Sequence, residues 1–356
     1  MRNLITVILF LFIAVNANAQ IKNPEAKKLY QQGIKEHDSG NYEKAISLYE
    51  EALVIEPGNE YLIYELGYSH NALKNYSKVV SLISKQIENG SVTRADMYVL
   101  LGNTYDMMND PGRSIETYKE GLSKFPNSGL MYYNYGITLA KQKEFDEALE
   151  KFEKGIAVDP SYPSNFYMAS KLLANSNESV WMVLYGEMYI NLIPDNDRSA
   201  ELSKMIYNFY ADRIRKNDTT YTVTINPMTL MSGKDGEMSL HSRYEMNCFL
   251  GVLAIKEYGD NLDGFAHLRD VITTLWTEKN EPQYRNILFD RQKKLMDFNP
   301  EYLTAYNYLI LAYADPERFN AWYEKNKTVF DEFAKWFADN PINFNSGVKY
   351  YRQQYD

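Results

Sequence analysis

Glycine and proline residues recur along the first half of the chain at a nearly fixed distance. The glycines stand 34, 35 and 34 residues apart, and a serine takes the next place 34 residues on: Gly33, Gly67, Gly102, Gly136 and Ser170. The prolines follow the same spacing, with one gap of two periods: Pro57, Pro126, Pro160 and Pro194. A period of about 34 residues is typical of stacked pairs of helices. The two series of regularly spaced residues therefore predict an α-solenoid.

The residues between these markers repeat as well. The first unit carries Leu29, Gly33, Tyr42, Ala45, Tyr49, Ala52 and Pro57, and the fourth carries Tyr132, Gly136, Phe145, Ala148, Phe152, Gly155 and Pro160. These positions resemble the signature of the tetratricopeptide repeat family. The small residues allow helix axes to approach closely, and the aromatic residues fill the gap that remains.

The resemblance implies an all-α fold in which a right-handed solenoid of helix pairs spans residues 20–195. Five repeats are expected, at 26–59, 60–94, 95–128, 129–162 and 163–196. The second and fifth depart from the pattern, because Val79, Gln86, Met182 and Tyr189 stand where small residues are expected. The fifth is therefore expected to be a distorted or capping pair.

Residues 199–356 match no family pattern but keep a helical one. Apolar residues recur at helical spacing in 200–215, 240–258, 262–277, 282–298, 301–314 and 316–338. In Thr219–Ile225 they alternate as in a strand, and the polar turn Ser232–Gly236 follows. A mainly helical C-terminal domain is predicted, interrupted by a short strand or hairpin, and degenerate repeats that continue the stack are one way to build it.

The N-terminus has the three parts of a secretory signal peptide. Basic Arg2 precedes the apolar run Leu4–Val15, and the small residues of Ala17–Ala19 follow. The run is too short for a spanning helix, so we expect cleavage between Ala19 and Gln20 and a periplasmic or secreted protein without a membrane span. The net charge of −9 argues against a nucleic-acid partner.

Few residues suggest chemistry. The best cluster is His241, Glu245 and Cys248, which share one helix face and could in principle bind a metal or form a nucleophile with its base. One helix face supplies too few ligands, and the surrounding apolar residues favour a structural role for the only cysteine. No catalytic residue, metal or cofactor is therefore expected, and a hydrolase or metal enzyme in this half is the weakest alternative.

The resemblance also implies a binding groove, because the first helices of tetratricopeptide units line a concave surface. The fifth positions of the five units are Tyr30, Tyr64, Val99, Tyr133 and Tyr167. Tyrosine offers a large apolar face and a hydroxyl at low entropic cost. The chain holds 31 tyrosines, so composition alone would place some of them there. The candidate surface comprises Tyr30, Tyr61, Tyr64, Tyr68, Asn71, Asn103, Asp106, Tyr133, Lys141, Tyr167 and Lys171.

The leading prediction is an exported scaffold or adaptor that binds an extended peptide or protein segment in this groove. Family members that clamp a C-terminal carboxylate use lysine and asparagine at positions taken here by Tyr30 and Ile34, so that ligand is not expected. The alternative is a glycan-binding module that uses the same aromatic groove.

Overall fold

The computed structural model describes residues 21–90, 92–217, 220–224, 238–278 and 281–355. The predicted signal peptide, residues 1–19, lies outside these residues. The chain forms two compact units that meet in sequence between Tyr162 and Pro163. Within the described part of the chain, every helix is too short or too polar to cross a membrane.

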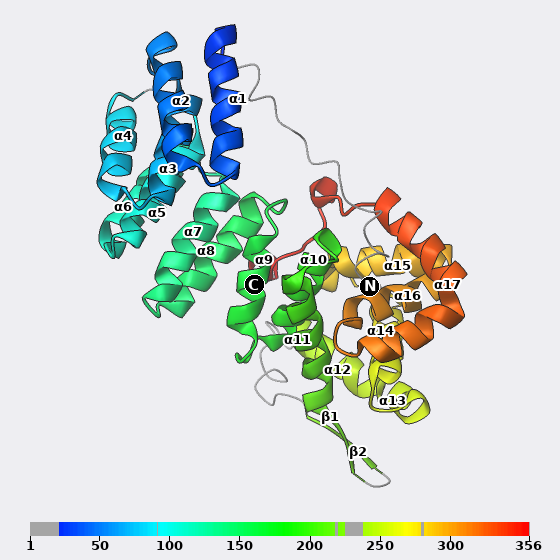
Figure 1. The fold of residues 1–356 in the computed structure, drawn as a ribbon. Helices are drawn as coiled ribbons and strands as arrows, with labels where there is room; N and C mark the ends of the chain where they lie inside the picture. Colours follow the sequence, from blue (N-terminus) through cyan, green and yellow to red (C-terminus); the bar gives the residue numbers. More distant parts are fainter. Residues whose placement is uncertain (1–20, 91, 218–219, 225–237, 279–280, 356) are drawn as a thin grey trace. The chain divides into compact units, whose positions relative to one another are not determined.

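The first unit is a run of antiparallel helix pairs (Figure 1). Each of the first four predicted repeats contains one pair, and the pairs are α1 (Pro24–Asp38) with α2 (Tyr42–Ile55), α3 (Glu60–Ala72) with α4 (Tyr76–Glu88), α5 (Ala95–Met107) with α6 (Pro111–Lys124), and α7 (Gly129–Lys141) with α8 (Phe145–Val158). The predicted helical solenoid is confirmed.

Glycines lie at most of the helix crossings in this unit and allow the two helices to approach closely. A Cβ atom on Gly33, Gly102 or Gly136 would lie under 3.0 Å from the ring that stands 16 residues later, at Tyr49, Tyr118 or Phe152. These rings are fully buried. The second repeat is looser, because a Cβ on Gly67 would lie 3.2 Å from Ile83 and Leu100. The regularly spaced glycines therefore mark positions where a ring of the second helix occupies the space of a side chain.

The turns inside the pairs follow the same period. A residue with positive φ stands two positions beyond the end of each first helix, and these residues are Gly40, Lys74, Asn109 and Lys143. A left-handed residue just after the last turn satisfies the terminal carbonyls of a helix. At three of these turns lysine or asparagine takes this conformation in place of glycine, so sequence alone does not reveal the position.

The second unit is also mostly helical, with one hairpin. Its elements are α9 (Ser164–Leu173), α10 (Ser179–Leu192), α11 (Asp197–Arg213), β1 (Ile214–Asn217), β2 (Thr220–Val223), α12 (Leu240–Leu250), α13 (Val252–Tyr258), α14 (Leu262–Glu278), α15 (Ile287–Phe298), α16 (Pro300–Leu311) and α17 (Pro316–Asp339), with 3₁₀ turns at Pro282–Tyr284, Phe344–Ser346 and Arg352–Gln354.

Three details differ from the predicted elements. The strand pairs with residues expected to end a helix, because Ile214 lies opposite Val223 in the antiparallel hairpin. The helix expected at 240–258 breaks at Gly251, where α12 meets α13. The helix expected from Pro282 begins as a 3₁₀ turn, and α15 starts at Ile287. The predicted turn Ser232–Gly236 lies outside the described residues.

Helix α10 explains why the fifth predicted repeat groups with the second unit and not with the first four. Every residue from Ser179 to Asn191 is buried, as expected for a helix enclosed on all sides. The C-terminal segment folds back onto it: the ring of Trp181 lies 5.4 Å from that of Tyr355, and the Arg352 amide donates to the Tyr185 hydroxyl at 3.0 Å. The compact units divide between Tyr162 and Pro163, whereas the boundary near 195 remains a prediction from the repeat pattern.

A buried charge network fills the middle of the second unit. Arg269 and Glu187 form an ion pair at 2.7 Å, and both are almost fully buried. Glu187 also accepts hydrogen bonds from Tyr306 and Gln292, and Arg269 donates to Asn307 at 2.9 Å. These bonds join α10, α14, α15 and α16.

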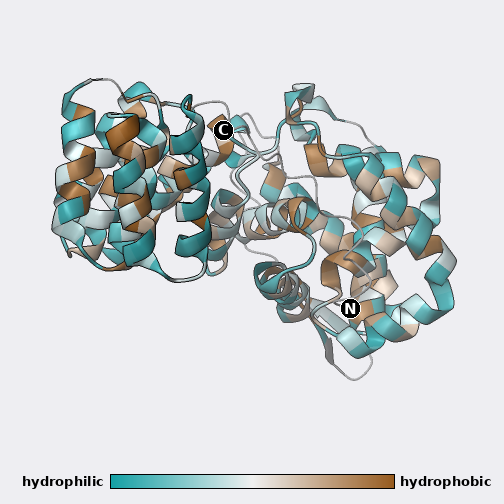
Figure 2. Cartoon of the chain, turned by 45° about the horizontal axis from the view of Figure 1, so that its top comes forward, coloured by the Kyte–Doolittle hydropathy of each residue, from teal (hydrophilic) through white to brown (hydrophobic). Residues whose placement is uncertain are grey.

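Figure 2 shows hydrophobic and hydrophilic positions alternating along the helices of each unit.

Candidate functional site

Three predicted groove tyrosines share one side of α3. Tyr61, Tyr64 and Tyr68 are spaced three and four residues apart, which places them in one row along a helix. The rings of Tyr64 and Tyr68 are stacked, with centroids 6.1 Å apart and planes 6° from parallel. Tyr68 is 47% exposed, so the row reaches solvent.

Arg94 extends this row at one end. Its guanidinium carbon lies 3.9 Å from the centroid of the Tyr61 ring and 4.9 Å from that of Tyr64. Asp96 holds the guanidinium by an ion pair at 2.5 Å. Arginine favours such sites because its planar cation stacks on aromatic faces and is weakly hydrated. Arg94 was not among the predicted groove residues.

His37 extends the row at the other end. Its ring stacks on Tyr68 at 4.9 Å, and Tyr42 meets its other side edge-on at 5.0 Å. Its Nδ1 shares a hydrogen bond with the Ser69 hydroxyl at 2.8 Å, and burial lowers the pKa of His37 below its usual value. We call Arg94, Tyr61, Tyr64, Tyr68 and His37 the tyrosine row.

A carboxyl group lies within the electrostatic reach of the row. Burial raises the pKa of Glu65 to about 7, although the nearby Arg94 cation opposes the shift. Tyr30, the first predicted groove tyrosine, is only 6% exposed, and its ring centroid lies 6.3 Å from that of Tyr49. Burial and the neighbouring Glu65 raise the pKa of Tyr30 to about 12. Tyr30 therefore supports the row from within the helix packing.

The next predicted residues of the first unit mostly join neighbouring repeats. The Asn71 amide donates to Thr104 at 2.9 Å, and Asn103 accepts from the Tyr118 hydroxyl at 2.6 Å. Asp106 forms an ion pair with Lys141. The first and third of these contacts link one repeat to the next, and the bond between Asn103 and Tyr118 joins the two helices of the third repeat.

Tyr133 and Val99 complete the predicted positions of this unit. Tyr133 is half-buried, and its ring lies 6.0 Å from Phe152 and 5.7 Å from Tyr162. Val99 is buried. The exposed aromatic surface predicted across all units is thus concentrated on α3.

Tyr167 and Lys171 belong to the second unit. The Tyr167 hydroxyl donates to Glu201, Lys171 pairs with the same carboxylate at 2.8 Å, and the guanidinium of Arg198 lies 4.8 Å from the Tyr167 ring centroid. This cluster ties α9 to α11. It repeats the chemistry of Arg94 on Tyr61 in a different packing context.

The cluster His241, Glu245 and Cys248 is buried on α12. Burial raises the pKa of the Cys248 thiol strongly, with the Glu245 carboxylate adding to the effect, so the sulfur stays protonated at neutral pH. Burial lowers the pKa of His241, but Glu178 and Glu245 more than offset this and raise it. A protonated thiol is a poor nucleophile and a poor metal ligand. Among the described residues, no group of three or more His, Cys, Asp or Glu side chains is arranged to hold a metal ion.

A sequence signal for Arg94 did exist. The residue before the first helix of a repeat caps that helix in the neighbouring repeats, where Asn59 and Ser128 accept hydrogen bonds from the first turn. Arg94 holds this place before the first helix of the third repeat, and it makes no side-chain capping bond to the described turn that follows. A good cap is worth about 1 kcal/mol. Arg94 gives up the stability of this cap, and its contacts with Tyr61 and Tyr64 take the place of the capping bond.

Comparisons with known proteins agree with this geometry. Residues 95–127 and residues 130–162 each match a family model described as tetratricopeptide repeat. No curated protein matches the chain.

Solved structures resemble about half of the chain. TTC0263, a thermophilic TPR protein of Thermus thermophilus, is 14% identical, with a TM-score of 0.42 over 51% of this chain and 98% of its own. PilF of Pseudomonas aeruginosa is 20% identical, with a TM-score of 0.45 over 53% of this chain and 86% of its own. YrrB, titled a TPR protein with an unusual peptide-binding site, is 19% identical, with a TM-score of 0.35 over 51% and 93%.

Tetratricopeptide repeats are scaffolds for protein–protein interaction, and this chain has that scaffold. The two matched repeats lie in the region where glycines meet rings 16 residues later and the inter-helix turns recur with the same period. The first half of the chain therefore carries tetratricopeptide repeats.

Proposed function

We propose that the chain is an exported scaffold that binds an extended segment of another protein along the tyrosine row. The observation that carries the proposal is a series of contacts in which Arg94 lies over both Tyr61 and Tyr64, Tyr64 stacks on Tyr68, and Tyr68 stacks on His37. Each ring is held by a neighbour on the same surface, and the row becomes exposed at Tyr68.

The physical advantage of this row is that its rings are already ordered. A side chain that must be immobilised on binding costs about 0.5–1.5 kcal/mol, and stacked rings have lost most of that freedom beforehand. Flat aromatic faces also suit extended or proline-rich segments, whose rings and backbone lie against them without folding. A tyrosine hydroxyl at the edge can bond to the backbone of the partner.

Export is supported by the sequence of the first residues. Arg2, the apolar run Leu4–Val15 and the small residues of Ala17–Ala19 together form the pattern that signal peptidase cleaves. N-terminal sequencing of the protein from cell envelopes and culture medium tests this directly. A mature chain that begins at Gln20 supports export, and a chain that begins at Met1 in the soluble cytosolic fraction would contradict it.

The binding test is crosslinking of the mature protein in its native envelope, followed by mass spectrometry of captured peptides. We expect Tyr64→Ala and Tyr68→Ala to lower capture of a specific protein, with crosslinked residues near α3. The matched control is Tyr76→Ala, which removes a half-buried tyrosine from the second helix of the same repeat. If all three variants capture the same protein equally, the row is not the binding surface.

A further inference from the structure

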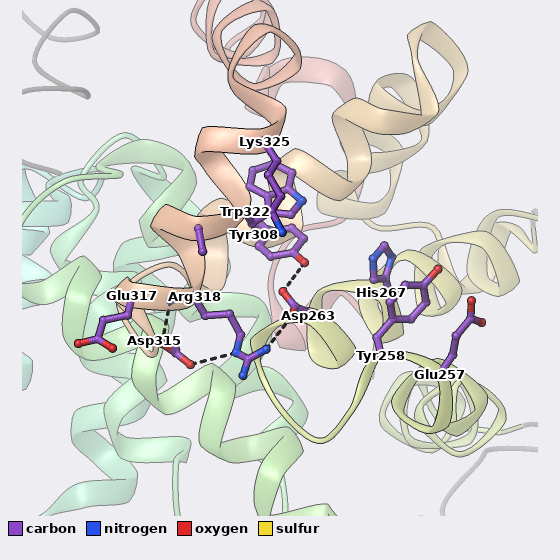
Figure 3. Close-up of a pocket in the computed structure, with 11 residues that line it drawn as sticks. Glu257, Tyr258, Asp263, His267, Tyr308, Asp315, Glu317, Arg318, Trp322 and Lys325 are labelled. Atoms are coloured by element: carbon purple, nitrogen blue, oxygen red, sulfur yellow. Dashed lines mark hydrogen bonds and ion pairs between the residues drawn. The ribbon is translucent and has the colours of Figure 1, made fainter.

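A cleft of about 780 Å³ opens in the second unit, away from the tyrosine row in the chain (Figure 3). It lies between the end of α13 with the start of α14 and the end of α16 with the start of α17. Four aromatic residues line it, Tyr258, His267, Tyr308 and Trp322, together with six charged residues, Glu257, Asp263, Asp315, Glu317, Arg318 and Lys325. The volume lies in the usual range for small-ligand sites, about 300–1,000 Å³.

Two stacked aromatic pairs form walls of this cleft. Trp322 lies on Tyr308 with centroids 4.0 Å apart and planes 10° from parallel, and Tyr258 lies on His267 at 3.9 Å and 27°. The inner rings of His267 and Tyr308 stand at 89° to each other. Tyr308, the inner ring behind Trp322, is 2% exposed, and Tyr258, the outer ring on His267, is 42% exposed. Tyr258 is therefore open to a ligand, and the His267 ring behind it is held by its hydrogen bond to Asp270.

The polar groups between these walls are held in place. Arg318 pairs with Asp263 at 2.8 Å and with Asp315 at 3.5 Å, and the Tyr308 hydroxyl donates to Asp263 at 2.6 Å. Figure 3 shows this chain of contacts crossing the cleft. His267 is bound to Asp270 at 3.1 Å, and Asp270 accepts from Asn307 at 2.8 Å, which leads into the buried network around Arg269.

The charges argue against an anionic ligand, because four carboxylates and two cations line the cleft. Asp263 and Asp315 are already paired with Arg318, and the exposed rim carries both Lys325 and the carboxylates of Glu257 and Glu317. A small anion would meet the two glutamates, and a small cation would meet Lys325 on the same rim. A neutral ligand with many hydroxyls can donate to the carboxylates and accept from the cations without a charge of its own.

We propose that this cleft binds a neutral carbohydrate, with sugar rings placed against Tyr258 and Trp322. The C–H face of a pyranose packs on an aromatic ring, and its equatorial hydroxyls reach the charged groups beside it. The alternative expected from the sequence put a glycan on the groove tyrosines. The structure favours the second unit instead, because here backed rings and fixed polar groups line the same cleft.

The test is calorimetric titration of the mature, full-length chain with four neutral probes: maltotriose, cellotriose, xylotriose and chitotriose. We expect at least one to bind, and Tyr258→Ala and Trp322→Ala each to weaken that binding by about tenfold, the value of one stacking contact. Trp322→Phe should retain more affinity than Trp322→Ala, which separates stacking from misfolding. The matched control is Phe298→Ala, which removes a 67% exposed ring of α15 outside the cleft.

Several results would overturn the proposal. Failure of all four probes to bind would do so, and so would binding that survives both Tyr258→Ala and Trp322→Ala. Binding of a tri-lysine or tri-glutamate peptide with the same dependence on these two residues would replace the neutral ligand with an ionic one. Tyr68→Ala leaves carbohydrate binding unchanged in this proposal, so its failure and the failure of the tyrosine row are distinguishable.

Discussion

The two units of this chain hold their helices together in different ways. In the first, glycines at crossings lie beneath rings that stand 16 residues later, as at Gly102 and Tyr118. In the second, among its described glycines, Gly186 and Gly251 face Ser170 and Leu268 instead of a ring. Its centre is held by the Glu187–Arg269 ion pair and the hydrogen bonds around it.

This difference shows that a contact can be recognised from the sequence when the two residues are separated by a short, recurring distance along the chain. The crossings of the first unit join residues 16 apart, and further hydrogen bonds join successive repeats, as between Asn71 and Thr104, 33 residues apart. The bonds to Glu187 come from Gln292 and Tyr306, which stand 105 and 119 residues away. Short contacts recur as a visible period, whereas long ones leave no pattern.

The sharpest way to test the comparison is to remove one charge from the second unit. Glu187→Leu leaves Arg269 buried without its counter-ion, and breaking a buried pair in this way costs about 3–5 kcal/mol of unfolding free energy. All four tryptophans lie at positions 181, 276, 322 and 336, so tryptophan fluorescence in urea follows the second unit alone. We expect its midpoint to fall sharply while hydrogen exchange in α1–α8 stays unchanged.

The double variant Glu187→Leu with Arg269→Met is the control. It removes both charges, so much of the lost stability should return, because a buried pair is often replaceable by apolar residues. If Glu187→Leu alone costs under about 1 kcal/mol, the network does not hold this unit together in the way we describe.

Much of the fold could be predicted because the repeated glycines and prolines stand where helix packing and helix ends require them. Gly33, Gly102 and Gly136 lie where a Cβ would overlap a ring, so their period reports the helix crossings themselves. The placement of α10 could not be predicted, since its partners at 352 and 355 come from the far end of the chain. The hairpin strand β1 is hidden in the sequence because Ile214 and Arg215 also fit helical spacing.

A second test compares two glycines of the first unit. Gly102→Ala forces a methyl group against the Tyr118 ring, and overpacking of this kind costs about 1–3 kcal/mol, more than the helix propensity gained. Gly67→Ala meets only the flexible ends of Ile83 and Leu100 at 3.2 Å, so the gain of about 1 kcal/mol in propensity largely offsets the contact.

Hydrogen exchange of the amides in α5 and α6, compared with α3 and α4, separates these two outcomes. Greater exchange in Gly102→Ala than in Gly67→Ala supports the role of the ring. Equal effects at the two positions would mean that the close approach of glycine to a ring does not distinguish the repeats.

The site was less predictable than the fold, and the residues show why. Tyr61, Tyr64 and Tyr68 follow from helical spacing on the first helix of a repeat. Arg94 lies directly before the first helix of the third repeat and His37 lies in the first repeat, so their contacts with the tyrosines depend on how neighbouring helix pairs pack. Tyr30 occupies an equivalent repeat position to Tyr64 but turns into the packing, which the position alone does not indicate.

A third test uses the carboxyl group beside the row. Because Glu65 has a folded-state pKa of about 7 and an ordinary value of 4.5, the folded state holds its proton more tightly than the unfolded state. Its contribution to stability is therefore present below about pH 4.5 and is lost as pH rises towards 7. Between these limits the first unit should lose about 3 kcal/mol of unfolding free energy that Glu65→Gln does not lose.

The measurement is hydrogen exchange in α1–α4 at pH 5 and pH 8, corrected for the intrinsic exchange rate at each pH. Glu43→Gln, which changes an exposed carboxylate of α2, serves as the control and should follow the parent protein. A parent protein with the same pH dependence as Glu65→Gln would contradict the raised pKa.

The smallest expected change in stability, and the most specific one for function, comes from Arg94→Asn. Asparagine restores a cap of the kind seen at Asn59, worth about 1 kcal/mol, and removes cation–π contacts worth about 0.5–1 kcal/mol. The two terms nearly cancel, so hydrogen exchange in α5 should barely change.

Partner capture should fall clearly in the same variant, because Tyr61 and Tyr64 lose the planar cation that orders them. Arg94→Lys sharpens the result, since lysine keeps the charge without the flat stack. If Arg94→Asn captures its partner as well as the parent protein does, the arginine is structural, and the difference between a capped repeat and an uncapped one has no bearing on binding.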